Sequence, residues 1–377
     1  MDFDLGKEQE MLKRSARDFL NKECSKDLVR EMMEDKKGYS PKLWRKMADL
    51  GWLAMAFPEK YNGISSTFLD LVVLFEEMGR ALVPGPFMPT VVHAGRTILA
   101  AGDEEQKQYF LPPIANGKSI MTMALTELSD NLDPSGITTT ALASGKDFVL
   151  KGTKLFVPDA HVADHIICVA RTKEGKSDDG ISLFIVDAKS KGIKTEVLVT
   201  ITGEKLCEVI FDSVTVPGKN LLGGLNTGWN IVRNMLDEAI VSECAWMLGG
   251  ARWALETTVN YTKERVQFGV PIGSFQAIQH KLANVSVEVE AATAIVYYAA
   301  WAIDQNDTAK TLAASAAMAW LSDIYKHATF EGVQLHGGMG FTWEHDMHLY
   351  LKRAKSSQVA FGDANYHREN IARILEI

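Results

Sequence analysis

The chain has 377 residues, of which 46% are hydrophobic and 23% charged, a composition that is typical of globular proteins and excludes disordered and fibrous classes. Its length suggests two or three domains. The net charge of −8 argues against a protein that works by neutralising nucleic-acid phosphates.

The sequence predicts a cytoplasmic protein without a membrane anchor or a metal site. Four cysteines are present but form no CxxC motif, so we expect free thiols in a reducing compartment. Residues 1–14 are too charged for a signal peptide, and the apolar run 291–303 is too short to span a bilayer. His345, Asp346 and His348 resemble metal ligands, but without a further ligand cluster we expect a polar surface turn there.

Residues 1–118 are predicted to form an N-terminal helical domain. Apolar residues recur there near helical spacing with charged residues between them, and proline and glycine separate the segments. The expected helices are 8–20, 43–53, 67–82 and 90–101.

Residues 119–224 are predicted to form a middle β domain. Short runs rich in β-branched residues alternate with clusters of Gly, Asp, Ser and Lys. Because no helical pattern separates these runs, we expect an antiparallel barrel or sandwich. The expected strands are 147–150, 165–171, 181–188, 193–199 and 206–216.

Residues 225–377 are predicted to form a C-terminal helical bundle. Helices as long as those expected here usually pack as a bundle. The expected helices are 228–261, 274–305 and 308–332. The chain as a whole is therefore predicted to be an α+β multidomain protein.

Four segments could contact a ligand, although each has an ordinary structural interpretation. Segment 121–136 is also consistent with a capped turn, and 151–160 with a strand that buries an aromatic residue. Segment 265–276 is a loop between helices whose Arg265 could present a cation to a phosphate. Segment 334–340 has paired glycines that let backbone amides approach a ligand, or that simply end a helix.

Taken together and in this order, the segments resemble the acyl-CoA dehydrogenase family. The resemblance is carried by ALTELSDNLD, FVPDA, RVQFGVPIGSFQAIQHKLANV and QLHGGMGFTWEHDMHLYLKRAK, and it covers nearly the whole chain. It implies the family fold: an N-terminal helical domain, a middle β-barrel domain and a C-terminal four-helix bundle. It also implies FAD as cofactor, an acyl-CoA substrate, α,β-desaturation and an electron-transfer flavoprotein as electron acceptor.

The resemblance further implies an obligate oligomer, either a homo-oligomer or a pair with a homologous subunit, in which FAD lies across the subunit interface. The residues implied to face the flavin are Leu125, Thr126, Phe156 and Val157. Those implied to hold its pyrophosphate and adenosine are Arg265, Gln276, Gln334, Gly337 and Gly338. Those implied to contact the substrate are Asp237, Phe361 and Gly362.

The catalytic Glu that most of the family carries near the carboxyl terminus is missing. The corresponding stretch reads VAFGDANYHR and places Phe361, which cannot accept a proton, at that position. A minority of the family keeps its base on a bundle helix, at a position that falls on Ala239 here. Glu243 lies one turn further along the same helical face, so we expect it to be the base, ahead of Glu238 and Asp363. The alternatives are a glutamate bonded inside the bundle and no base at all.

Other departures concern the flavin and CoA. Pro158 replaces the hydroxyl residue that meets the flavin in the family and has no donor to offer. Ile240 replaces the arginine that partners CoA beside Asp237, and SDNL replaces a Gly-Ser run in the first signature.

Three functions therefore remain open. The first is an active acyl-CoA dehydrogenase for an unusual acyl group, such as a branched, aromatic, alicyclic or steroid-derived chain. The second is a non-catalytic or half-site subunit of a heteromeric acyl-CoA dehydrogenase. The third is other CoA-linked flavin chemistry on the same scaffold, because a fold does not fix a reaction.

Overall fold

The computed structural model describes residues 5–129 and 132–377, so residues 130–131 of the first signature lie outside it. The chain divides into two compact units. One, here called the helical unit, comprises Met1–Val29, Phe68–Val83 and Ile240–Ile377. The other, here called the β unit, comprises Arg30–Thr67 and Pro84–Ala239.

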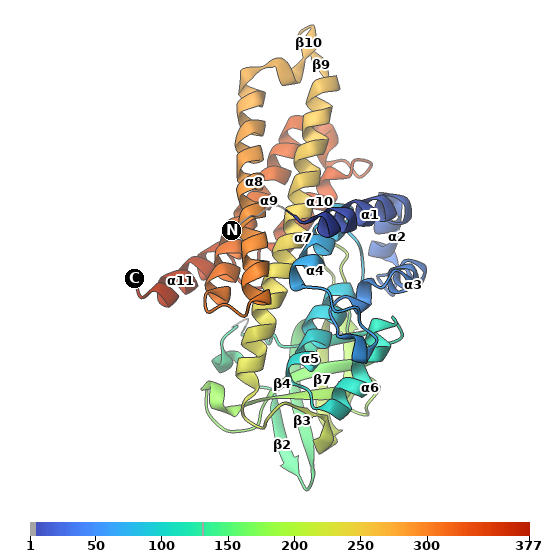
Figure 1. Ribbon diagram of the computed structural model, residues 1–377, viewed down its shortest axis with the longest axis vertical. Helices are drawn as coiled ribbons and strands as arrows, with labels where there is room; N and C mark the ends of the chain where they lie inside the picture. Colours follow the sequence, from blue (N-terminus) through green and yellow to red (C-terminus); the bar gives the residue numbers. More distant parts are fainter. Residues whose placement is uncertain (1–4, 130–131) are drawn as a thin grey trace. The chain divides into compact units, whose positions relative to one another are not determined.

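The helical unit is built from long helices of the carboxyl-terminal half and two helices from the amino-terminal part of the chain (Figure 1). α4 consists almost entirely of buried residues, as expected for a helix surrounded by others. The elements are α1 (Lys7–Glu23), α4 (Phe68–Ala81), α7 (Gly228–Glu264, from Ile240 on), β9 (Val266–Gln267), β10 (Val270–Pro271), α8 (Gln276–Asp304), α9 (Lys310–His336), α10 (Met347–Ser357) and α11 (Ala364–Leu375).

Glycines let α4 and α7 approach each other within backbone contact. A Cβ atom at Gly249 would lie 1.8 Å from the carbonyl oxygen of Glu76, and one at Gly79 would lie 2.0 Å from the carbonyl oxygen of Trp246. Any side chain larger than hydrogen at either position would push the two helices apart.

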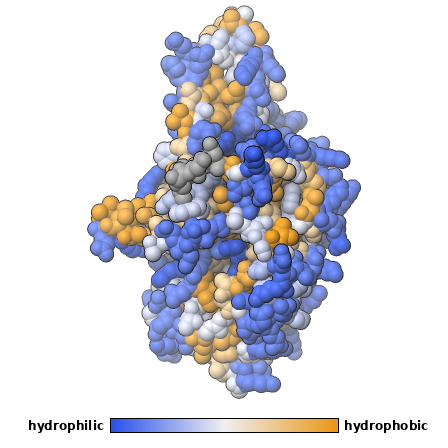
Figure 2. Space-filling model, in the orientation of Figure 1, coloured by the Kyte–Doolittle hydropathy of each residue, from blue (hydrophilic) through white to orange (hydrophobic). Residues whose placement is uncertain are grey.

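α7 and α8 run side by side and are joined at one end by the β9–β10 hairpin (Figure 1). Arg252 on α7 donates to Thr293 on α8, with 2.6 Å between Nη2 and Oγ1. The hairpin exposes Phe268 by 93% and Val266 by 52%, and Figure 2 shows apolar residues at the surface of this end. This end of the helical unit therefore presents apolar side chains that the described residues of the unit leave exposed.

The β unit combines an eight-stranded sheet with shorter helices. The strand order is β6-β7-β3-β2-β4-β5-β8, and β1 pairs with β4. The strands are β1 (Met121–Ala124), β2 (Thr140–Ser144), β3 (Asp147–Pro158), β4 (His165–Arg171), β5 (Ile181–Asp187), β6 (Ile193–Val197), β7 (Leu206–Val216) and β8 (Leu221–Leu222). The helices are α3 (Pro41–Asp49), the π-helix Pro89–Arg96, α5 (Thr97–Ala101) and α6 (Glu104–Ala115), while α2 (Lys26–Glu34) crosses the division between the units.

The order of helices, β-sheet and helices along the chain confirms the predicted fold class. The sheet is not wholly antiparallel, however, because β1 and β2 pair in parallel with β4. β1 follows a helical segment rather than a hairpin, so nothing in the chain obliges it to run antiparallel to its neighbour. The boundaries 1–118, 119–224 and 225–377 remain a prediction.

No helix within residues 5–129 and 132–377 is both long and apolar enough to cross a membrane. Across the same part of the chain, no three His, Cys, Asp or Glu side chains gather as a metal site requires. The four cysteines are buried free thiols.

Candidate functional site

Two segments predicted to face the flavin lie together in the β unit. The backbone N–H of Leu155 donates to the carbonyl oxygen of Thr126 at 2.9 Å, and the ammonium of Lys154 donates to the carbonyl oxygen of Leu125 at 2.9 Å. The two residues that follow β1 and the second half of β3 are therefore joined by hydrogen bonds from consecutive residues.

Phe156 is turned outward by a local irregularity in β3. The pairing of β3 with β7 shifts register between Lys154 and Val157, and Phe156 has a φ of 54°, a left-handed conformation that is unusual for a bulky residue. The Phe156 side chain is consequently 51% exposed, whereas Val157 is 1% exposed and points into the core. Of the two, only Phe156 offers a side chain to a ligand.

The predicted pyrophosphate residues Arg265 and Gln276 both lie in the helical unit, on either side of the β9–β10 hairpin. Arg265 follows α7, its carbonyl oxygen accepts from the N–H of Ile272 at 2.8 Å, and its side chain is exposed. Gln276 is the exposed first residue of α8, whose amino terminus has no side-chain cap. Unsatisfied N–H groups at a helix start suit a negatively charged ligand.

Gln334, Gly337 and Gly338 lie at the carboxyl end of α9, which packs against the carboxyl end of α7. The rings of Tyr261 and His336 stack there with 4.3 Å between their centroids. Gly337 has φ 64° and ψ −141°, a conformation that only glycine adopts readily. A Cβ atom at Gly337 or Gly338 would meet no described atom within 4 Å.

These residues fit the diphosphate part of a dinucleotide. One guanidinium and two side-chain amides supply exposed donors, and Gly337 and Gly338 expose their backbone, although the Gly337 N–H itself donates to the carbonyl oxygen of Gln334. Such a set matches the oxygen acceptors of a diphosphate. The glycines leave open space in which a ligand can approach the backbone closely.

Glu243, the predicted base, is a buried carboxyl group in the helical unit. Its side chain is 5% exposed, and the Ser357 hydroxyl donates to Oε1 at 2.5 Å. Arg353, one turn earlier on α10, places Nη2 3.4 and 3.5 Å from the two carboxyl oxygens. Burial raises the pKa of Glu243 to about 7, although the Ser357 hydrogen bond acts to lower it.

Two aromatic residues extend the polar environment of Glu243. The Arg353 guanidinium lies 5.1 Å from the centre of the Trp246 ring, a cation–π distance. Tyr325 on α9 is fully buried, and burial together with the Glu243 charge raises its pKa well above the ordinary value. The Tyr325 hydroxyl has no hydrogen-bond partner among the described residues.

The two alternative carboxylates have structural partners. Glu238, in the β unit, accepts from Arg96 through both oxygens at 2.7 Å. Asp363 is exposed and caps α11 by accepting from the N–H of Tyr366 at 2.8 Å. Glu243 also has partners, Ser357 and Arg353, but it is the most buried of the three carboxyl groups, and burial raises its pKa to about 7.

The predicted substrate residues are divided between the two units. Asp237 is buried in the β unit, whereas Phe361 and Gly362 lie in the helical unit between α10 and α11. His367 Nε2 donates to the carbonyl oxygen of Phe361 at 3.0 Å. Ser357, the hydrogen-bond partner of Glu243, lies four residues before Phe361, which occupies the position of the usual base.

The sequence did not indicate Ser357, Arg353, Lys154 or Glu127. Ser357 and Arg353 lie more than a hundred positions from Glu243, and no spacing rule connects them. Lys154 lies on a strand that also contains Asp147, Lys151 and Thr153, so nothing in its sequence surroundings marks it as the buried lysine.

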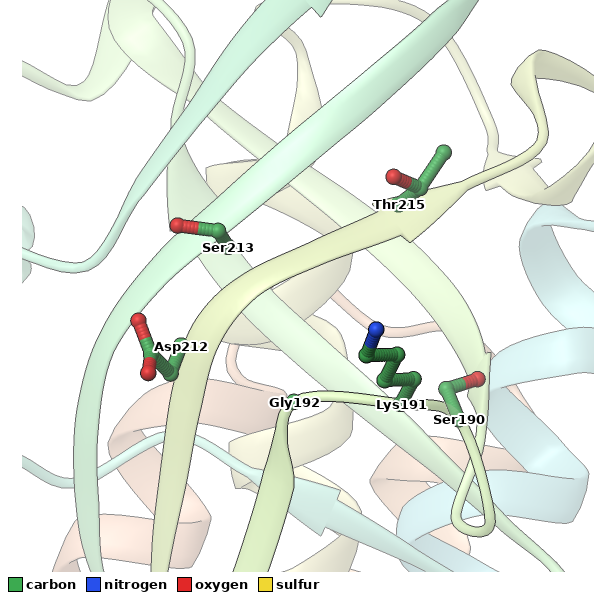
Figure 3. A pocket seen from close by; sticks show the side chains of 6 residues that line it. All are labelled: Ser190, Lys191, Gly192, Asp212, Ser213 and Thr215. Atoms are coloured by element: carbon green, nitrogen blue, oxygen red, sulfur yellow. The ribbon is translucent and has the colours of Figure 1, made fainter.

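A surface pocket in the β unit lies where β6 begins beside β7 (Figure 3). All of its lining residues are half-buried or exposed, and none of them is a predicted ligand residue. We assign it no ligand. The lining residues are Ser190, Lys191, Gly192, Asp212, Ser213 and Thr215.

Models of three domains match this chain in succession. Residues 6–118 match the acyl-CoA dehydrogenase N-terminal domain, residues 122–214 the middle domain and residues 226–376 the C-terminal domain.

Similar proteins cover the whole chain. The probable acyl-CoA dehydrogenase YngJ of Bacillus subtilis is 33% identical, with 100% of each chain covered. The subunit CarC of the caffeyl-CoA reductase-Etf complex of Acetobacterium woodii is also 33% identical, with 98% of each covered. The solved butyryl-CoA dehydrogenase of Megasphaera elsdenii has a TM-score of 0.92 at 31% identity, with 100% of each covered. A chain of the ChsE4-ChsE5 complex of Mycobacterium tuberculosis has a TM-score of 0.90 at 26% identity, and the match covers 100% of this chain and 99% of that chain.

Proposed function

This chain belongs to the acyl-CoA dehydrogenase family of oxidoreductases that act on CH–CH groups and typically use FAD, and from that premise we propose that it desaturates an unusual acyl-CoA thioester between the α and β carbons. The observation that carries the proposal is the Glu243 carboxyl, which is buried and has a pKa of about 7. A general base works best when its pKa lies near the working pH, and an ordinary glutamate titrates well below it.

In this proposal Glu243 takes the proton from the substrate α-carbon. The Ser357 hydroxyl holds Oε1 in place, and burial keeps the carboxyl basic enough to accept a proton near neutral pH. The backbone N–H of Phe361 or Gly362 is proposed to polarise the thioester oxygen as negative charge develops there.

FAD is the proposed cofactor and supplies the acceptor for the hydride that leaves the β-carbon. The β unit is proposed to face the flavin with Leu125, Thr126, Phe156 and the backbone of Val157. The donor set from Arg265 to Gly338 is proposed to hold the pyrophosphate and adenosine of an FAD that a second chain shares, so that the working protein is an oligomer.

The proposed electron partner is an electron-transfer flavoprotein, supported by the relative that is a subunit of a reductase-Etf complex. That relative is named a reductase and others are named dehydrogenases. The same residues can catalyse desaturation and the reverse reduction, because a reaction and its reverse pass through the same transition state.

The test is anaerobic mixing of the purified flavoprotein with a panel of acyl-CoAs while the flavin absorbance is followed. Desaturation predicts bleaching by at least one thioester and loss of bleaching in Glu243→Gln by about a hundredfold or more, the scale of a lost general base. The control Glu331→Gln also changes a buried carboxyl of the helical unit, one held by Lys281 at 2.7 and 2.9 Å, and should bleach like the wild type. Full activity in Glu243→Gln would remove Glu243 from the mechanism.

A second candidate is a non-catalytic or half-site subunit, which the phenylalanine at position 361 favours. The similarity to a complex of two differently named chains supports the same possibility. In that case the chain should co-purify with a homologous subunit from its native source, and turnover by the pure homomer would exclude it.

A third candidate, redox-neutral CoA chemistry, gives a different stoichiometry in the same experiment. Without an electron acceptor, desaturation stops after one equivalent per flavin, whereas an elimination continues.

A further inference from the structure

The β unit contains a buried ion pair that none of the roles above uses. The Lys154 side chain is 0% exposed and that of Glu127 is 5% exposed, and 2.7 Å separates Nζ from Oε1. Lys154 lies on β3 and Glu127 three residues after the end of β1. A fully buried lysine is rare in proteins and needs a compensating partner.

Glu127 is held from several directions at once. Oε1 also accepts from the N–H of Thr139 at 3.0 Å, and Oε2 accepts from the N–H of Thr138 at 2.9 Å and from its hydroxyl. Burial by itself would raise the pKa of Glu127, but the Lys154 charge and these donors lower it, so the carboxylate is ionised at neutral pH. The position of the Lys154 ammonium is therefore fixed by a rigid anion.

Lys154 uses that fixed position to connect two segments. Besides Glu127, its ammonium donates to the carbonyl oxygen of Leu125 at 2.9 Å. The next residue, Leu155, donates to the carbonyl oxygen of Thr126 at 2.9 Å, and the residue after that is the outward-turned Phe156. One buried side chain and one backbone hydrogen bond thus link the Leu125–Thr126 backbone to the stretch of β3 that carries Phe156.

We propose that Lys154 is a positioning residue for the cofactor: through Glu127 and Leu125 it fixes the mutual geometry of the two segments that face the flavin. This inference rests on the proposed function, because it assumes that Leu125–Thr126 and Phe156 contact FAD. A side chain that neither touches the cofactor nor reacts then determines how tightly FAD is held. Preorganisation of this kind lowers the entropic cost of binding, since the segments need not be ordered by the ligand.

The experiment compares three purified full-length variants with the wild type in the absence of substrate. Lys154→Met keeps the length of the side chain but removes the ammonium, and Lys154→Arg keeps a cation. Gln106→Met is the matched control, because it removes partly buried hydrogen bonds of 2.9 Å to the carbonyl oxygens of Lys219 and Leu221 elsewhere in the β unit. For each variant, the dissociation constant of FAD and the unfolding temperature of the FAD-free protein are measured.

Lys154→Met should weaken FAD binding by roughly tenfold or more, which corresponds to at least about 1.4 kcal/mol, and should make the bound flavin more fluorescent. Lys154→Arg should recover part of this loss. Gln106→Met should lower the unfolding temperature without a comparable change in FAD affinity.

A purely structural role predicts instead that FAD affinity follows unfolding temperature in both Lys154→Met and Gln106→Met, and that result would overturn the inference. Unchanged FAD affinity in Lys154→Met would overturn it as well. If Lys154→Met does not fold, Glu127→Gln provides the same comparison, because it keeps the shape of the side chain but leaves the ammonium without its counter-ion. Failure of the wild type to bind FAD would refute the proposed function itself, whereas failure confined to the variants concerns Lys154 alone.

Discussion

The raised pKa of Glu243 predicts that the stability of the protein depends on pH in a defined window. The carboxyl titrates near pH 7 in the folded protein, whereas its ordinary pKa is 4.5. A difference of one in pKa corresponds to about 1.4 kcal/mol, so burying the ionised carboxylate costs roughly 3 kcal/mol. This cost falls on the folded state only when the group is ionised.

The direction follows from proton binding. Between pH 4.5 and about 7 the folded protein holds a proton on Glu243 that the unfolded chain has released, so stability decreases as pH rises through this window. Below pH 4.5 the carboxyl is protonated in both states and the cost disappears. Glu243→Gln cannot ionise and should lose this component of the pH dependence.

The assay is urea unfolding of the wild type and of Glu243→Gln at about pH 5 and about pH 8. The stability of the variant relative to the wild type should increase between these pH values by an amount on the order of 2–3 kcal/mol. Ser357→Ala removes the hydrogen bond that lowers the folded pKa, so the upper limit of the window should rise while the lower limit stays at the ordinary pKa of 4.5. If the difference between Glu243→Gln and the wild type is the same at both pH values, Glu243 is not a buried group that titrates near neutrality.

Three further outcomes are expected. Gly249→Ala should destabilise the helical unit by about 3 kcal/mol or more in urea unfolding, because its Cβ would lie 1.8 Å from the carbonyl oxygen of Glu76. A change below about 1 kcal/mol would mean that α4 and α7 separate easily. Tyr325→Phe should raise stability by about 1 kcal/mol, since it removes a buried hydroxyl without a described partner, and a clear loss would reveal one. The four buried cysteines should react with a thiol reagent at neutral pH only after denaturant is added. Burial raises the pKa of Cys24 and Cys207 to about 11, that of Cys168 to about 12 and that of Cys244 well above its usual value, so rapid labelling of the native protein would contradict this prediction.

The elements with a clear periodic pattern were predictable from the sequence. The predicted strands at 165–171 and 206–216 coincide with β4 and β7, and α4 extends over Phe68–Ala81 where 67–82 was expected. β1 and β2 were not predicted as strands, because β1 has only four residues and lies inside a motif that also suits a turn. α6 was missed because it contains Pro112 and Pro113, although its capping box at Asp103 and Gln106 marks its start.

The residues of the candidate site were likewise predictable from the sequence only in part. Glu243 was expected as the base from its position one turn beyond Ala239, and the structure shows the burial that raises its pKa. The Arg96 partner of Glu238 lies 142 positions away and becomes visible only in the folded chain, whereas Asp363 caps α11 through the N–H of Tyr366, which is only three positions on.

The sequence by itself determined the order of helical and β segments, the family, and the absence of the usual glutamate at Phe361, because each of these depends on residues close together in the chain. The tertiary structure alone decided which charges are buried and what neutralises them. Lys154 with Glu127, and Glu243 with Ser357, are joined across 27 and 114 positions. Proton affinity is set by desolvation and by groups a few ångströms away in space, which local sequence patterns do not specify.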